Sequence, residues 1–252
     1  MGPIGIVSAM HEELAAVLEA LPDEQSVQAA GRDFWQGHWH GHPVVAVLSR
    51  IGKVAAATTA TVLIERFGVG QIVFTGVAGG LGPGVKVGDV VLARSFVQHD
   101  MDASPLFPKH EVPLYGRSRF QTDADLSAAL LLAAQAVLAQ VAHHVGSQAV
   151  NEFALQSARV HQGLIASGDR FVSTSAECRS LQQALPEALA VEMEGAAVAQ
   201  VCADYGVPFA ALRTISDRAD DDAHADFSRF IREVASRYSV AMLSQWLLTG
   251  PA

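Results

Sequence analysis

Cysteine is scarce in this chain, with Cys178 and Cys202 as the only two among 252 residues. Neither belongs to a Cys-x-x-Cys pair or to the cysteine and histidine spacing of a zinc site. The sequence therefore supports neither a disulfide framework nor a metal centre. Because so few thiols suit a reducing compartment, we expect a cytoplasmic protein without a bound metal.

Positive charge and long apolar runs are also lacking. The chain has 17 Lys and Arg against 26 Asp and Glu, a formal net charge of -9. Nucleic acids and anionic membranes are bound by stripes of Lys and Arg, so neither is expected as a partner. No apolar run approaches the roughly 18 residues of a membrane span, and no secretion signal opens the chain. We expect a soluble protein that is not exported.

Apolar sequence is abundant, at 50% of the residues, which is enough for one large core. We read residues 1–252 as one domain. Apolar runs of strand length occur at residues 4–7, 44–48, 71–75, 90–93, 163–166, 188–191 and 209–215. Helical segments lie between or after them, at residues 12–21, 53–67, 125–141, 176–185, 195–205 and 227–248. This alternation predicts an α/β fold whose mostly parallel sheet is covered on both faces.

Two regions break the alternation. Residues 32–40 and 42–48 have the pattern of a β-hairpin, which would add an antiparallel element and make the sheet mixed. Residues 99–119 contain three prolines and one glycine without any periodicity. They predict a long loop, a class of segment that is often functional.

Acidic side chains gather where predicted strands end. Glu192 and Glu194 lie between a strand and the next helix, Asp217 follows another strand, and Glu12 and Glu13 follow the first. Open α/β sheets bind ligands at the carboxyl ends of their strands. A carboxylate beside an apolar strand is costly unless it is paired or used. Each acid alone is explained as well by a helix cap, but the whole set indicates a site for a sugar and a base.

Other polar patterns carry less information. Thr75-Gly-Val-Ala-Gly-Gly80 follows a predicted strand, but it is neither a P-loop nor a GxGxxG motif, so nucleotide phosphates are not its expected ligand. Ser49-Arg-Ile-Gly-Lys53 joins a strand to a helix and is either a tight turn or a site for an anion or a water molecule. His38, His40 and His42 have no acid or cysteine nearby to complete a metal site.

Six motifs follow one another along almost the whole chain. They are Gly5-Ile-Val-Ser-Ala-Met-His-Glu-Glu13, Ile51-Gly-Lys-Val-Ala-Ala56, Thr75-Gly-Val-Ala-Gly-Gly80, Ser167-Gly-Asp-Arg-Phe171, Val191-Glu-Met-Glu194 and Ile215-Ser-Asp217. Together they resemble the 5'-methylthioadenosine/S-adenosylhomocysteine nucleosidases of the nucleoside phosphorylase superfamily. The resemblance implies a three-layer α/β/α fold with a mixed central sheet, a homodimer, and a role in methionine salvage. It implies hydrolysis of an adenine N-glycosidic bond without a cofactor.

The resemblance also implies roles for individual residues. Glu13 would be the general base that orients the attacking water, and Asp217 the acid that protonates adenine N7. Glu194 would hold the ribose hydroxyls, with Met193 packing on the sugar and Arg213 steadying Glu194. This chemistry needs a protonated or proton-sharing Asp217 near neutral pH, and hence a raised pKa.

The remaining implied residues form the walls of the pocket. Those around adenine are Ala78, Gly79, Phe171, Val172 and Ser216. Those on the water side and around the 5'-thioalkyl group are Met10, Ile51 and Phe227, with Ala103 and Phe107 from the long loop. Part of this loop wall is expected to come from the partner subunit of the dimer.

Three positions depart from the family pattern. His11 replaces an acid that is usual in the Met-Glu-Glu-Glu run, while Glu13 keeps its register. Val77 stands where some members have serine or threonine, which removes a hydroxyl. The segment 99–107 is longer than in some relatives.

Other functions fit parts of the pattern. An aminofutalosine nucleosidase acts on the same adenine and ribose with a different 5' group, so that activity and dual use both stay open. A phosphorylase would need arginines gathered on the phosphate, whereas Ile51-Gly-Lys-Val offers one lysine. A non-catalytic nucleoside-binding protein is expected to have lost at least one of Glu13, Glu194 and Asp217.

Overall fold

The computed structural model describes residues 2–218 and 227–250, which are built around one large β-sheet. The strands are β1 (Ile4–Ser8), β2 (Gln25–Ala29), β3 (Arg32–Trp39), β4 (His42–Leu48), β5 (Gln71–Gly80), β6 (Val90–Gln98), β7 (Arg119–Gln121), β8 (Val160–Ser167), β9 (Ala188–Glu192) and β10 (Phe209–Asp217). The helices are α1 (His11–Glu19), α2 (Lys53–Phe67), α3 (Ala124–Ala139), α4 (Val141–Val145), α5 (Ser147–Glu152), the 3-10 turn η1 (Leu155–Ser157), α6 (Ser175–Ala184), α7 (Gly195–Tyr205), α8 (Phe227–Phe230), the π-helical η2 (Ile231–Ala235) and α9 (Ser236–Thr249).

The strands are ordered β10-β6-β8-β9-β5-β1-β4-β3-β2, and β5 also pairs with β10. Five strands, β5, β10, β6, β8 and β9, therefore form a closed ring from which the others extend. The pairs of β1 with β4 and β5, of β10 with β5, and of β8 with β6 and β9 are parallel. The pairs of β3 with β2 and β4, of β9 with β5, and of β6 with β7 and β10 are antiparallel. The prediction of a mixed sheet is confirmed.

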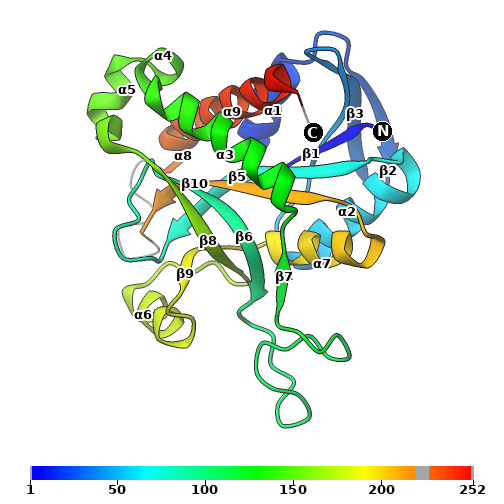
Figure 1. The fold of residues 1–252 in the computed structure, drawn as a ribbon, viewed down its shortest axis with the longest axis vertical. Coiled ribbons are helices and arrows are strands. Elements are labelled where there is room, and N and C mark those ends of the chain that lie inside the picture. Colours follow the sequence, from blue (N-terminus) through cyan, green and yellow to red (C-terminus); the bar gives the residue numbers. More distant parts are fainter. Residues whose placement is uncertain (1, 219–226, 251–252) are drawn as a thin grey trace.

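Helices cover both faces of this sheet (Figure 1). α1, α3 and α9 lie on one face, where Ile6 of β1 belongs to the same buried cluster as Trp246 of α9. α2 and α7 lie on the other face, where Val7 shares a cluster with Leu63 of α2. Because both faces are covered, the neighbours Ile6 and Val7 are both fully buried, and the strand shows no alternation of polar and apolar residues. The three-layer α/β/α prediction is confirmed.

The predicted elements are present, with differences that have physical causes. β5 continues to Gly80, so the glycine-rich segment expected after the strand is its second half. The long C-terminal helix is divided by the π-helical turn η2. β2 was not predicted because its polar residues are mostly exposed and give no apolar signal. No helix among residues 2–218 and 227–250 is both long and apolar enough to cross a membrane.

The two irregular regions match their predictions. β3 and β4 form the expected hairpin, and its two turn residues, His40 and Gly41, have φ values of 50° and 81°. Positive φ at both positions is what a two-residue turn of this kind requires. The loop between β6 and β7 contains only an isolated bridge between Val112 and Arg117, and it projects from the body of the molecule (Figure 1).

Candidate active site

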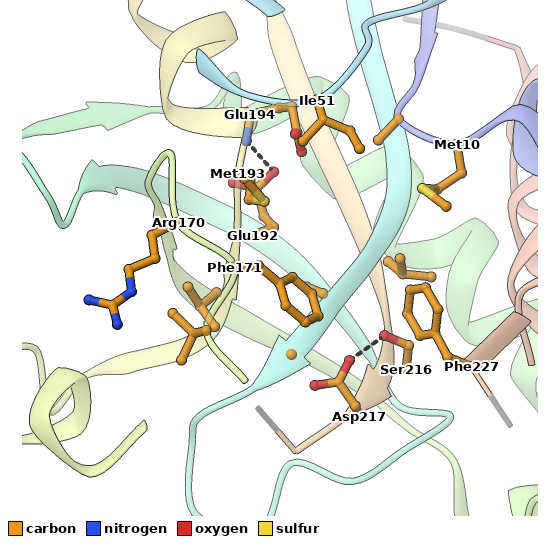
Figure 2. Close-up of a pocket in the computed structure, with 16 residues that line it drawn as sticks. Met10, Ile51, Arg170, Phe171, Glu192, Met193, Glu194, Ser216, Asp217 and Phe227 are labelled. Atoms are coloured by element: carbon orange, nitrogen blue, oxygen red, sulfur yellow. Dashed lines mark hydrogen bonds between the residues drawn. The ribbon is translucent and has the colours of Figure 1, made fainter. Parts of the chain in front are cut away.

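A cavity of about 210 Å³ opens where β1, β5, β9 and β10 end. Figure 2 shows the side chains gathered around it. The residues that line it are Ala9, Met10, Ile51, Val77, Ala78, Gly79, Arg170, Phe171, Val172, Val191, Glu192, Met193, Glu194, Ser216, Asp217 and Phe227. Of the residues implied by the sequence, Glu13, Arg213, Ala103 and Phe107 are not part of this lining.

Glu13 is fully buried in the first turn of α1, beside the cavity. Its Oε2 accepts a hydrogen bond of 3.1 Å from the backbone N–H of Met10, so it also caps the helix. Its Oε1 has no hydrogen-bond partner within the described part of the chain. Burial raises the pKa of Glu13 to about 7, against smaller opposing effects of backbone N–H groups and Arg213. A carboxyl group with this pKa is suited to general base catalysis near neutral pH.

Gly76 of β5 lies next to the buried carboxyl group of Glu13. A Cβ atom at Gly76 would lie 3.6 Å from both oxygens of Glu13 and 3.7 Å from the guanidinium carbon of Arg213. A larger side chain would fill the space between these two charged groups. The glycine therefore leaves room for them to lie close to the strand.

Glu192 and Arg213 form a buried ion pair, with 2.9 Å between Arg213 Nη2 and Glu192 Oε2. Glu192 also accepts hydrogen bonds from the Gly195 N–H and from Ser167 Oγ, so it caps α7. The helix-cap explanation is thus correct for Glu192. The guanidinium of Arg213 pairs with this last residue of β9, so the expected effect of Arg213 on Glu194 is not a direct hydrogen bond.

Glu194 lines the cavity. Its Oε1 accepts a hydrogen bond of 2.8 Å from the Gly52 N–H, at the N-terminus of α2. The neighbouring Lys53 N–H donates to Asp169 Oδ1 at 2.7 Å. The turn that the sequence marked as an anion or water site therefore binds two carboxylates of the protein itself. Burial, followed by repulsion from Glu192, raises the pKa of Glu194 to about 7.

Asp217 ends β10 on another side of the cavity. It is 7% exposed, and Ser216 Oγ donates a hydrogen bond of 2.7 Å to its Oδ2. β5 lies alongside, with Gly79 opposite Asp217 in the strand register. Figure 2 shows the Phe171 ring facing the same cavity as Ser216 and Asp217, while the side chain of Arg170 points away. A flat apolar ring next to a polar edge is suited to a heterocyclic base.

The long loop does not reach the cavity within this chain. Ala103 and Phe107 are partly exposed and absent from its lining. The loop is connected to the site through Lys53, whose Nζ lies 2.6 Å from Asp100 Oδ1 and 3.1 Å from Gln98 Oε1. The one lysine of the Ile51-Gly-Lys-Val motif is therefore already paired.

Two residues important to the site were not assigned a role from the sequence. Ser167 binds Glu192, and Asp169 binds the N-terminus of α2. A signal for Ser167 was present, since it ends β8 and pairs in register with Glu192 of β9. Alignment of the two strand ends would have revealed this contact.

Metal ligands are not grouped in the described residues. No set of three or more His, Cys, Asp or Glu in residues 2–218 and 227–250 is placed to hold a metal ion. The three histidines of the hairpin have separate partners: His38 binds Asp23, His40 binds Ser244, and His42 binds the Leu247 carbonyl.

Comparisons with known proteins agree with this geometry. The family model of the phosphorylase superfamily matches residues 3–244. A 5'-methylthioadenosine/S-adenosylhomocysteine nucleosidase from Shewanella denitrificans is 35% identical over 246 residues, covering 98% of each chain. The structure of such a nucleosidase from Neisseria meningitidis, in complex with methylthio-immucillin-A, superposes with a TM-score of 0.86 at 33% identity, covering 99% of this chain and 100% of that one.

A third relative is named for a different activity. The structure of a futalosine hydrolase from Helicobacter pylori has a TM-score of 0.81 at 34% identity and covers 97% of both chains. The match in sequence and in fold spans nearly the full length in every case. This chain therefore belongs to the phosphorylase superfamily and, within it, to the family of 5'-methylthioadenosine/S-adenosylhomocysteine nucleosidases.

Proposed function

We propose that this protein hydrolyses the N-glycosidic bond of 5'-methylthioadenosine and S-adenosylhomocysteine, giving adenine and a 5-thio-substituted ribose. The observation that carries the proposal is that the buried acids Glu194 and Asp217 line one cavity and that Glu13, buried in the first turn of α1, lies beside it. Glycosidic cleavage passes through an oxocarbenium-like state, which nearby carboxylates stabilise while an acid neutralises the leaving group.

Each acid has a part that suits its surroundings. Glu13, with a pKa of about 7, is partly ionised at neutral pH and accepts the proton of the attacking water. Glu194 binds the ribose hydroxyls and faces the positive charge that develops on the sugar. Asp217 donates the proton to adenine N7. Arg213 acts on Glu194 through Glu192, whose position it determines.

The remaining residues of the cavity hold the substrate. Phe171 stacks on the adenine, the backbone of Val172 binds its edge, and Ala78 and Gly79 of β5 lie along its plane. Met193 packs on the ribose. Met10, Ile51 and Phe227 surround the 5'-thioalkyl group, and Ser216 holds Asp217.

The same cavity favours water over phosphate as the nucleophile. Phosphate is bound in proteins by arginine forks or by lysine. The side chain of Arg170 points away from the cavity (Figure 2), Arg213 is committed to Glu192, and Lys53 to Asp100. Among the described residues, therefore, no cationic side chain at this cavity is free to bind phosphate.

A second substrate is supported by one observation. The futalosine hydrolase from Helicobacter pylori is about as similar to this chain as the nucleosidase from Neisseria meningitidis. Aminofutalosine shares the adenine and ribose that the cavity would hold and differs only in its 5' group. We therefore keep it as an alternative or additional substrate.

The protein would act in the cytoplasm, in methionine salvage, as a homodimer whose partner subunit completes the pocket. Two observations support the dimer. Leu106 and Leu114 of the long loop are 84% and 92% exposed, and Ile51 and Val54, at the start of α2, are 63% and 78% exposed. The contact between Lys53 and Asp100 joins the two segments that carry these exposed apolar side chains.

Adenine release distinguishes the candidate activities. Methylthioadenosine, S-adenosylhomocysteine and aminofutalosine are each incubated with the protein in phosphate-free buffer and then with phosphate added. We expect phosphate-independent release, with the relative rates ranking the substrates. Release only with phosphate would identify a phosphorylase, and no release under either condition would identify a binding protein.

Asp217→Asn tests the acid. The side chain keeps its size and its neighbour Ser216, so we expect an unchanged circular dichroism spectrum and melting temperature. Turnover of methylthioadenosine should fall by about 10²- to 10⁴-fold, the range for loss of a general acid. Asp125→Asn, an exposed change in α3, is the matched control. Near-normal turnover in Asp217→Asn would refute the mechanism.

Glu13→Gln tests the base and the cost of burying it. The pKa of Glu13 rises from 4.5 to about 7 on folding. The stability of the wild type is therefore reduced as pH rises from 4.5 through about 7, while glutamine has no proton to lose. Relative to wild type, the free energy of unfolding of the variant should increase by about 3 kcal/mol as pH rises through this window, and it should increase no further above it.

Urea unfolding at several pH values from 4.5 to 8 measures this gain, with Glu19→Gln on the exposed side of α1 as the control. Glu13→Gln should also lose nearly all turnover. Stability curves that run parallel for Glu13→Gln and wild type would contradict the assignment of a buried, raised-pKa base.

Sedimentation equilibrium tests the shared site. We expect the wild type to have twice the mass of one chain. The Leu106→Asp variant should dissociate at a higher protein concentration than wild type, because a charge would be buried in the interface. The KM for methylthioadenosine should rise as the dimer dissociates. An active monomer would refute the shared pocket wall.

A further inference from the structure

A second cavity, of about 810 Å³, adjoins the candidate active site. The two share Ala9, Met10 and Ile51, the part of the site where the 5' group of a nucleoside would lie. The second cavity continues between α1 and the β3–β4 hairpin, and we call it the tail groove. A 5' substituent longer than a methylthio group would extend into it.

The lining of the tail groove contains two adjacent arginines, Arg32 and Arg50. Arg32 donates to the carbonyls of Ala30 and Ala55, and Arg50 donates to the carbonyl of Gly31. Neither forms an ion pair with a carboxylate of the described residues, and Arg32 Nε is buried without a hydrogen-bond partner. Burial and the neighbouring charge of Arg50 lower the pKa of Arg32. Two guanidinium groups that repel each other at a cavity favour an anion between or beside them.

The backbone of Arg50 is unusual as well. Its φ of 62° lies in the left-handed region, which glycine or asparagine occupies at lower cost. A long cationic side chain thus occupies a position where its backbone is strained. Strain of this kind is concentrated at binding sites, where the side chain has a use.

The rest of the groove has an apolar wall and groups of the opposite charge. Trp35 and Leu18 contribute apolar surface, and Glu12 and Asp33 belong to the same lining. A short aliphatic chain that ends in a carboxylate and an ammonium group would find a partner for each part. An aromatic chain that ends in a carboxylate would use the apolar wall and the arginines alone.

We propose that the tail groove binds the terminal carboxylate of the 5' substituent, with Arg50 as the residue that contacts it and Arg32 adding positive potential. This inference rests on the proposed nucleosidase function and adds a determinant of substrate preference to it. Nucleosides with a carboxylated 5' chain are bound more tightly than their uncharged counterparts because of this contact. The methylthio group is too short to reach it.

The test uses one adenosine scaffold with four 5' groups. Methylthioadenosine is uncharged, 5'-(3-aminopropyl)thioadenosine is cationic, S-adenosylhomocysteine is zwitterionic, and aminofutalosine has an aryl carboxylate. The value of kcat/KM is measured for each with wild type, Arg50→Asn, Arg50→Lys and the exposed control Arg94→Asn. Asparagine adopts the left-handed backbone readily, so Arg50→Asn should fold, as its melting temperature will show.

Arg50→Asn should lower kcat/KM about tenfold for S-adenosylhomocysteine, chiefly through KM, because a charge-assisted hydrogen bond to a non-reacting group is lost. Methylthioadenosine and the aminopropyl compound should change less than twofold. Arg50→Lys should retain most of the carboxylate preference, and high salt should reduce it in the wild type.

A lower kcat/KM of Arg50→Asn for aminofutalosine, alone or together with S-adenosylhomocysteine, would also support the carboxylate contact. It would show which of the two carboxylated 5' groups makes that contact. The proposal would be overturned if Arg50→Asn lowered kcat/KM equally for all four compounds. It would also be overturned if kcat/KM fell for neither carboxylated compound. Failure of the wild type to release adenine from any compound is a separate result, which would overturn the nucleosidase function itself.

Discussion

The buried ion pair of Arg213 and Glu192 determines the arrangement of the site. Arg213 comes from β10 and Glu192 from β9, which are not neighbours in the sheet, and the guanidinium also binds the Phe74 carbonyl of β5 between them. A buried charge is tolerated only when its partner and its hydrogen bonds are complete. Glu192 is therefore fixed in position, and the chain after it must place Met193 and Glu194 at the cavity.

The ion pair also affects the protonation of the site. Arg213 favours the charged forms of Glu13 and Glu194, but burial outweighs it, and both pKa values lie at about 7. The site thus holds carboxyl groups that exchange protons near neutral pH. Bulk water would stabilise their charged forms and remove this property, so exclusion of all but the reacting water is a chemical requirement of the site as well as a result of packing.

Much of this arrangement follows from the sequence. Covered strands alternating with helices predicted a mostly parallel sheet with helices on both faces. The rule that ligands bind at strand ends grouped the acids that follow the strands, and the family resemblance then selected Glu13, Glu194 and Asp217 among them. The partner of Arg213 was not predictable in the same way. Glu192 and Glu194 are two residues apart, and only the packing of β9 against β8 and β5 decides which of them faces Arg213. Ala103 and Phe107 of the long loop are absent from the cavity lining of one chain, so the shared pocket wall stays a proposal that no contact within the chain reports.

The closed ring of β5, β10, β6, β8 and β9 has a consequence for the order of folding. Closure requires β5, at Gln71–Gly80, to pair with β10, at Phe209–Asp217, across most of the chain length. Contacts between such distant segments have a large entropic cost and form slowly. Asp217 meets Gly79 only through this pairing. The part of the site that contains Asp217 and Gly79 is therefore complete only after this long-range pairing has formed.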